Sequence, residues 1–179
     1  MKKATKQPYS IFSPVFLICT MAGLGKIPIM PGTIGSLVAA IEFSFYITHI
    51  KSIFAYIGYL IVILPVITYC IFAYCKNTGN QDPKEVIIDE YYGQYIAQLF
   101  SYIICYQILS DKILMYLLIV ISFLLFRIFD ISKISLVGYC DKNIKNAFGV
   151  LLDDIVAGFF AAISCSIMVF IIYFIYFKA

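Results

Sequence analysis

The acidic side chains of this chain gather at the borders of its apolar segments. The adjacent pair Asp89 and Glu90 precedes one apolar segment, Asp130 follows another, and the adjacent pair Asp153 and Asp154 precedes the last. A carboxylate at the edge of a membrane helix is costly without a partner, so each of these residues is a candidate for function. Clustered carboxylates without histidine or thiol neighbours are typical ligands of a hard cation, Mg²⁺ above all. The pattern therefore predicts a metal site.

Basic side chains accompany one of these clusters. Arg127, Asp130 and Lys133 recur every three residues and therefore share one stripe of a helix. Ion pairing within that helix would explain the spacing as well. Arg127 is, however, the single arginine in a chain that otherwise uses lysine. A planar guanidinium can bind two phosphate oxygens at once, whereas lysine offers a point charge. We interpret Arg127 and Lys133 as phosphate-binding residues.

A glycine-rich segment, residues 23–36, precedes the first apolar segment. Its backbone amides at a helix N-terminus, with the side chains of Lys26, Thr33 and Ser36, suit an anion. Proline, glycine and threonine are also ordinary signals for the start of a helix. The segment is not a Walker A loop, because isoleucine follows Lys26. We include Lys26, Thr33, Gly35 and Ser36 in the predicted phosphate site.

Together, these segments hold the residue types of metal-assisted phosphoryl chemistry. Other phosphatase chemistries lack their residues: the sequence has no Cys-x5-Arg loop, and its one histidine, His49, lies away from the acidic clusters. A serine triad lacks its base for the same reason. The residues leave two nucleophiles open, a water molecule at the metal or an aspartate side chain.

The composition of the chain is that of a membrane protein. Of its 179 residues, 63% are hydrophobic and 13% are charged, against roughly 45–50% and about 25% in soluble domains. This excludes a disordered chain and an ordinary soluble enzyme. The net charge of +3, without a long basic run, excludes a nucleic-acid-binding protein. The six cysteines show neither disulfide nor zinc spacing.

We predict an all-α, polytopic membrane protein with four to five apolar helices in a single domain, residues 1–179. The candidate spans are 34–50, 53–75, 92–109, 113–126 and 155–177. A full span needs about 20 apolar residues. The first, third and fourth segments are short by this standard. One or two of them could be re-entrant, where protein covers the backbone.

The distribution of lysine and arginine predicts the orientation in the membrane. If the N-terminus lies inside, all basic residues fall on the inner face except Lys51, Lys112 and Lys178. All acidic residues except Glu42 and Asp111 fall on that same face. We expect catalytic loops on the cytoplasmic side of the membrane.

Four motifs resemble the phosphatidylglycerophosphatase A family in order and spacing. They are Pro31-Gly-Thr-x-Gly-Ser36, Asp82-Pro-x-Glu-Val-x-x-Asp89-Glu90-x-x-Gly93, Phe126-Arg-x-Phe-Asp130-x-x-Lys133 and Gly149-x-x-x-Asp153-Asp154-x-x-Ala-Gly158. They cover about residues 23–158. The resemblance implies an Mg²⁺-dependent enzyme of the bacterial inner membrane that removes the phosphomonoester of phosphatidylglycerophosphate and yields phosphatidylglycerol.

Carried over by position, the resemblance implies catalytic roles for Asp89, Glu90, Arg127, Asp130, Asp153 and Asp154, with Thr33 and Ser36 in the glycine-rich segment. We expect Asp89, Asp130, Asp153 and Asp154 to hold one or two Mg²⁺ ions. Glu90 would assist them or act as a base. The expected partner is a membrane lipid, and no oligomeric state is indicated.

The sequence leaves two other functions open. A lipid-headgroup phosphotransferase would also use aspartates at the membrane edge with Mg²⁺, but its Asp-Gly-x-x-Ala-Arg pattern is missing here. A small cation transporter would place its carboxylates at mid-membrane depth. The carboxylates of this chain border the apolar segments instead, and Glu42 is the exception.

Overall fold

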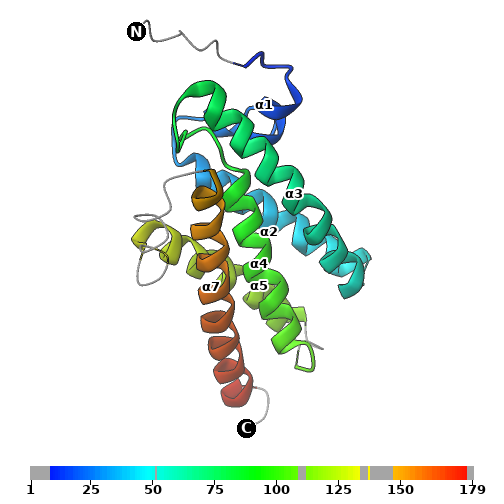
Figure 1. Cartoon of the computed structure of the whole chain (residues 1–179). Helices are drawn as coiled ribbons and strands as arrows, with labels where there is room; N and C mark the ends of the chain where they lie inside the picture. The colour runs from blue at the N-terminus through cyan, green and yellow to red at the C-terminus, as the bar shows by residue number, and fades with distance from the viewer. Residues whose placement is uncertain (1–8, 51, 109–111, 134–136, 138–146, 177–179) are drawn as a thin grey trace, which may run out of the picture.

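The computed structural model describes residues 9–50, 52–108, 112–133, 137 and 147–176. Within these residues the chain forms α-helices and one short 3-10 helix, without a strand, which confirms the all-α prediction. The elements are α1 (Pro14–Cys19), η1 (Leu24–Lys26), α2 (Pro31–His49), α3 (Ile53–Thr78), α4 (Ile88–Cys105), α5 (Lys112–Ser132) and α7 (Ala147–Tyr176) (Figure 1). Each of the five predicted apolar segments coincides with one of the long helices.

Three of the described helices are long and apolar enough to cross a membrane. They are α3, α5 and the stretch Phe148–Tyr176 of α7. The predicted segments at 34–50 and 92–109 correspond to α2 and α4, which are not among these three. Lys51 and Lys178, two of the three basic residues predicted on the outer face, lie outside the described residues, as does Asp111.

The acidic helices begin earlier than the apolar pattern predicts. Helix α4 begins at Ile88 rather than 92, and α7 begins at Ala147 rather than 155. Asp89 and Glu90 lie in the first turn of α4, where carboxylates interact favourably with the helix dipole. Asp153 and Asp154 lie about two turns into α7. Helix α5 likewise continues to Ser132. The acidic residues that we expected in loops therefore lie within helices, near their ends.

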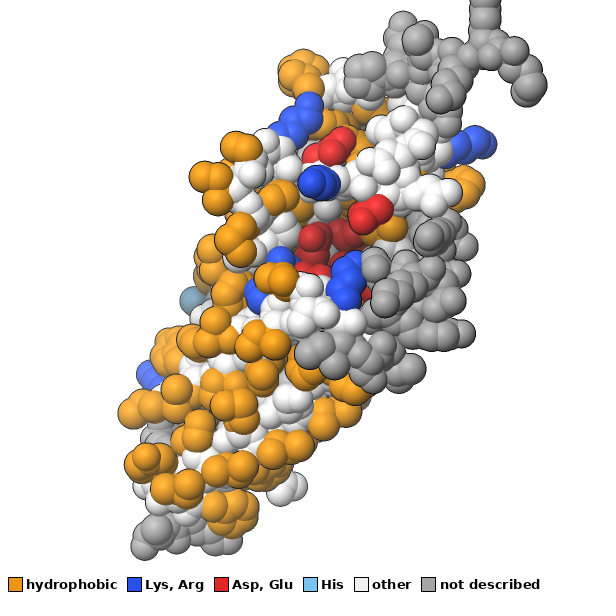
Figure 2. Space-filling model, turned by 90° about the vertical axis from the view of Figure 1, so that its left-hand side faces the viewer, with side chains coloured by type: hydrophobic (Ala, Val, Ile, Leu, Met, Phe, Trp, Pro, Cys, Tyr) orange, Lys and Arg blue, Asp and Glu red, His pale blue; other side chains and the backbone are white. Residues whose placement is uncertain are grey.

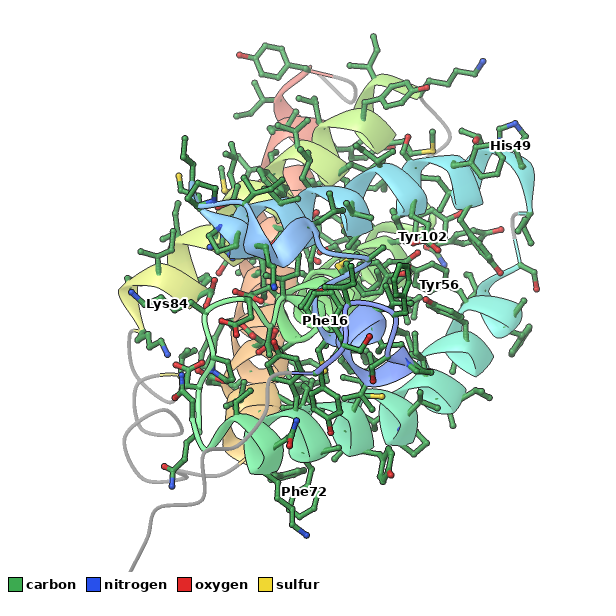
Figure 3. The ribbon with its side chains drawn as sticks, turned by 90° about the horizontal axis from the view of Figure 1, so that it is seen from above. Phe16, His49, Tyr56, Phe72, Lys84 and Tyr102 are labelled. Carbon is green, nitrogen blue, oxygen red and sulfur yellow. The ribbon has the colours of Figure 1, made fainter. Side chains whose placement is uncertain are left out.

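Helix α4 forms the centre of the bundle. It packs against α2, α3, α5 and α7, and Figure 1 shows it between α3 and α7. Aromatic rings pack on its α3 side, where Tyr56 and Tyr95 stack with ring centroids 5.0 Å apart. Seen from above, Phe16 of α1 lies between α2 and α3, whereas Phe72 points away from the bundle (Figure 3). The core thus surrounds the helix that begins with Asp89 and Glu90.

Helices α4 and α7 meet through two glycines. A Cβ atom at Gly158 would lie 2.5 Å from the backbone oxygen of Gly93, and a Cβ atom at Gly93 would lie 2.6 Å from that of Asp154. Small residues allow helix backbones to approach this closely. The contact lies about one helical turn from both acidic pairs and fixes the distance between them.

We expect Gly158→Ala to destabilise the protein by about 1–3 kcal/mol, because the added methyl must push α7 away from α4. The apparent melting temperature in detergent measures this effect. Gly58→Ala on α3 is the matched control, since a Cβ atom there meets nothing within 4 Å. Alanine also favours a helix over glycine, so the control should melt at the same temperature or slightly higher. Equal melting temperatures for the two variants would contradict the close contact.

Candidate functional site

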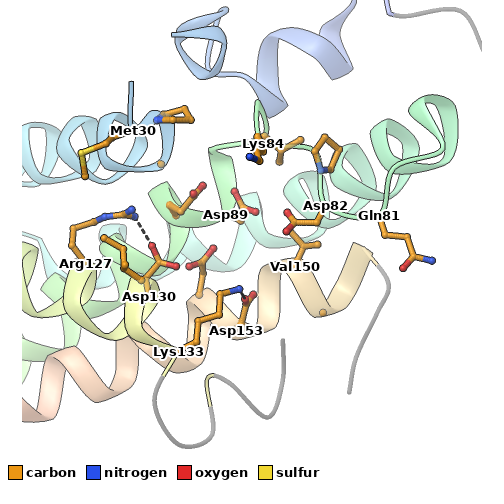
Figure 4. A pocket seen from close by; sticks show the side chains of 18 residues that line it. Met30, Gln81, Asp82, Lys84, Asp89, Arg127, Asp130, Lys133, Val150 and Asp153 are labelled. Carbon is orange, nitrogen blue, oxygen red and sulfur yellow. Dashed lines mark hydrogen bonds and ion pairs between the residues drawn. The ribbon is translucent and has the colours of Figure 1, made fainter. Parts of the chain in front are cut away.

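A cavity of about 620 Å³ opens where the N-termini of α2, α4 and α7 meet the C-terminal end of α5. Figure 2 shows acidic side chains inside a hollow of this face, with basic side chains around it. Figure 4 shows the residues that line the cavity. Its charged lining consists of Asp82, Lys84, Asp89, Glu90, Arg127, Asp130, Lys133, Asp153 and Asp154. The structure therefore brings the three separated acidic clusters into one site.

Three of the carboxylates form the tightest group. Asp89, Glu90 and Asp154 each offer an oxygen atom, and these atoms lie within 4.8 Å of one another. Asp89 and Asp154 are 4% and 5% exposed. Asp89 Oδ1 and Glu90 Oε2 are buried and have no hydrogen-bond partner among the described residues. Buried carboxylate oxygens without donors are the expected environment of a cation.

Burial and mutual repulsion disfavour the charged forms of this group. Burial raises the pKa of Asp89 well above its usual range, and the adjacent charge of Glu90 adds to the increase. Burial also raises the pKa of Glu90 to about 7, with a further contribution from Asp130. A divalent cation between these oxygens would reverse both shifts, because it favours the ionised carboxylates.

The other two predicted metal ligands, Asp130 and Asp153, form ion pairs with basic side chains. Arg127 Nη1 forms an ion pair with Asp130 on the same helix and donates to Ser36 Oγ of α2 at 3.3 Å. Lys133 Nζ lies 3.0 Å from Asp153 Oδ2 of α7. Arg127 and Asp130 therefore form the ion pair within one helix that their spacing allows. Lys133 forms an ion pair with α7.

The start of α2 approaches the carboxylates closely. A Cβ atom at Gly32 would overlap Glu90 Oε1, so a larger residue there would displace the Glu90 carboxylate. Ser36 Oγ donates to the backbone oxygen of Gly32 at 3.0 Å while it accepts from Arg127. Thr33 Oγ1 is buried without a partner among the described residues. Three members of the predicted glycine-rich segment thus lie beside the site, in a helical turn rather than in a loop.

Of the predicted phosphate-binding residues, Arg127 and Lys133 line the cavity, whereas Lys26, Thr33, Gly35 and Ser36 do not. The ammonium of Lys26 lies over the ring of Phe16, 4.9 Å from its centroid. Gly35 faces the segment before α4, where a Cβ atom would lie 2.5 Å from the backbone oxygen of Ile87. Lys26 therefore contacts α1, and Gly35 is a packing position between α2 and that segment.

The structure also reveals contacts that sequence reasoning missed. Lys84 and Asp82 line the cavity, although neither was among the predicted site residues. Asp82 begins one of the four motifs, and this was the signal that could have indicated it. Glu42 accepts a hydrogen bond of 2.6 Å from the Tyr91 hydroxyl, which in turn lies 2.8 Å from the Tyr59 hydroxyl. This polar contact ties α2 to α4 away from the cavity.

The fold and the cavity define an all-helical membrane protein with an acidic site at its helix ends. The family model of phosphatidylglycerophosphatase A matches residues 17–170. The chain therefore belongs to this family, whose members are phosphatases.

Curated relatives agree with this assignment. Phosphatidylglycerophosphatase A of Escherichia coli strain K12 is 29% identical, over 95% of this chain and 90% of the relative. The protein of the same name from Haemophilus influenzae is 27% identical, over 86% and 88%. A relative from Bacteroides thetaiotaomicron, provisionally named phosphatidylinositol-3-phosphatase, is 30% identical over 85% and 91%. No solved structure matches the chain.

Proposed function

We propose that this protein hydrolyses the phosphomonoester of phosphatidylglycerophosphate to give phosphatidylglycerol, at the cytoplasmic face of a bacterial inner membrane. The observation that carries the proposal is the carboxylate group of Asp89, Glu90 and Asp154 beside Arg127 in one cavity at the helix ends. The names of the relatives from Escherichia coli and Haemophilus influenzae support the choice of substrate.

The oxygen donors of the site fit Mg²⁺. Asp89, Glu90 and Asp154 would hold the ion, because their oxygens converge, and Asp89 Oδ1 and Glu90 Oε2 have no hydrogen-bond partner within the described part of the chain. When bound, Mg²⁺ acts as a Lewis acid that offsets the charge developing on the phosphoryl oxygens. This set differs from the expected one, since Asp130 and Asp153 pair with Arg127 and Lys133 instead. We assign these two aspartates to the orientation of the basic side chains.

The basic side chains bind and orient the phosphate. Asp130 and Ser36 fix the guanidinium of Arg127 from two helices, and its Nε remains without a partner among the described residues. A guanidinium held in this way is preorganised for the phosphate, so little side-chain entropy is lost on binding. Lys133 also lines the cavity and adds a second positive charge there.

The position of the cavity suits a lipid substrate. The described basic residues Lys84, Arg127 and Lys133 line the cavity, whereas Lys112 begins α5 at its other end. This asymmetry supports a cytoplasmic location for the cavity. A phosphate at the membrane surface can then reach the site while the acyl chains stay in the bilayer.

The test is phosphate release by the purified protein in detergent micelles. We expect release from phosphatidylglycerophosphate with Mg²⁺, a loss of at least about a hundredfold in EDTA, and recovery when Mg²⁺ is restored. Phosphatidylinositol 3-phosphate is assayed in parallel as a second substrate, because the relative from Bacteroides thetaiotaomicron is named for that lipid. Faster release from that lipid would overturn the choice of substrate. Release that EDTA leaves unchanged would overturn the metal assignment.

A further inference from the structure

A mostly apolar groove of about 540 Å³ runs between α2 and α5. Its walls extend from Leu37 to Thr48 on α2 and from Tyr116 to Phe123 on α5. Several of these side chains are exposed along the sides of the helices, among them Ile41 and Val120. The lower part of the face in Figure 2 is likewise mostly hydrophobic. The groove is therefore open to the surroundings of the bundle.

The groove continues from the catalytic cavity along both helices. Gly32 of the cavity and Ala40 of the groove lie two turns apart on one face of α2. Arg127 of the cavity and Phe123 of the groove lie one turn apart on α5. The hydrogen bond from Arg127 to Ser36 joins the two helices at the cavity end of the groove. A molecule with its phosphate at Arg127 thus has the groove directly beneath it.

The length of the groove matches one leaflet of a bilayer. At about 1.5 Å per residue, the stretch from Leu37 to Thr48 is about 16 Å long. The hydrocarbon core of a bilayer is about 30 Å thick, so a single leaflet measures about 15 Å. A groove of this length can take an acyl chain from the headgroup region towards the middle of the bilayer.

We propose that the groove between α2 and α5 binds one acyl chain of the lipid whose phosphate lies at Arg127. The proposal rests on the proposed lipid phosphatase activity and adds to it a means of selecting lipids over water-soluble phosphomonoesters. One chain lies along Leu37, Ile41 and Val120, while the second chain stays in the surrounding bilayer. Van der Waals packing against these side chains lowers the KM for long-chain substrates, because it holds the lipid with its phosphate at Arg127.

The experiment fills the groove and compares substrates of different chain length. Ser44→Phe narrows the groove from α2, and Val120→Trp narrows it from α5, so that the failure of one variant to fold leaves the other. Ala55→Phe is the matched control, because Ala55 is exposed on α3 away from the groove. Each protein is assayed on dioleoyl and on dibutyryl phosphatidylglycerophosphate in mixed micelles with Mg²⁺.

We expect both groove variants to lower kcat/KM for the dioleoyl lipid by about tenfold, because the larger side chains remove the packing contacts of the acyl chain. Their kcat/KM for the dibutyryl lipid should stay within about threefold of wild type, and the control should match wild type on both lipids. Equal losses on both lipids, or no loss on either, would contradict binding of an acyl chain in the groove. A change in the oligomeric mass of the variants without chain-length selectivity would also contradict it, because the groove would then bind a second copy of the protein. If the wild type releases no phosphate from either lipid, the proposed function itself fails.

Discussion

Asp154→Asn should reduce Mg²⁺-dependent phosphate release by at least about a thousandfold, equivalent to about 4 kcal/mol of transition-state stabilisation. Asparagine keeps the size of the side chain but removes the charge of one of the three oxygens that lie within 4.8 Å. The two remaining carboxylates would hold a divalent cation weakly and in an altered geometry. Initial rates on phosphatidylglycerophosphate at saturating Mg²⁺ measure the effect.

Stability measurements separate this loss from misfolding. In EDTA, Asp154→Asn should melt at the same temperature as wild type or higher, because it removes one of several buried carboxylates that repel one another. Asp82→Asn is the control, since Asp82 lines the same cavity but is exposed, and its activity should change less than about threefold. Full activity of Asp154→Asn, or a loss that follows a lower melting temperature, would remove Asp154 from the metal site.

Arg127→Lys should lower kcat/KM by about a hundredfold, or about 2.7 kcal/mol. Lysine keeps the positive charge, but it cannot contact Asp130 and Ser36 and still present a planar pair of donors to the phosphate. The loss should fall on kcat as well as on KM, because the charge on the phosphoryl oxygens is redistributed in the transition state. Steady-state kinetics on phosphatidylglycerophosphate check both constants.

Lys84→Arg is the control for this exchange. Lys84 lines the cavity and is exposed, so a change of cation there should alter kcat/KM by less than about threefold. Unchanged catalysis in Arg127→Lys would reduce Arg127 to a structural link between α2 and α5.

The positions of the helices followed from the sequence, but their ends did not. Runs of apolar residues located all five long helices, because burial or lipid contact demands such runs. The apolar pattern predicts later starts for α4 and α7 than the structure has, because the charged residues Asp89 and Asp153 lie before the apolar runs. In the structure these residues lie inside helices, where their carboxylates face a cavity rather than lipid.

The members of the candidate site were predictable from their types and spacing, whereas their partners were not. Asp130 and Asp153 have the same side chain as Asp89 and Asp154. Only the distances between helices show that Asp89 and Asp154 form the carboxylate group that could bind a cation, whereas Asp130 and Asp153 form ion pairs. The contact of Lys133 with Asp153 joins positions 20 residues apart. Lys26 turns to Phe16 instead of the cavity, because a long side chain beside a glycine-rich turn can point in several directions.

The burial of α4 has a consequence for how the protein enters the membrane. This helix carries Gln94, Gln98 and Ser101, all fully buried, and it is not among the helices apolar enough to cross a membrane. Lipid alone would offer such a segment little stabilisation, since polar groups in hydrocarbon are costly. Its place in the bilayer depends on α2, α3, α5 and α7, which surround it. The position of Asp89 and Glu90 beside Asp154 is therefore coupled to the assembly of the bundle, and a chain whose helices had inserted without associating would lack the candidate site.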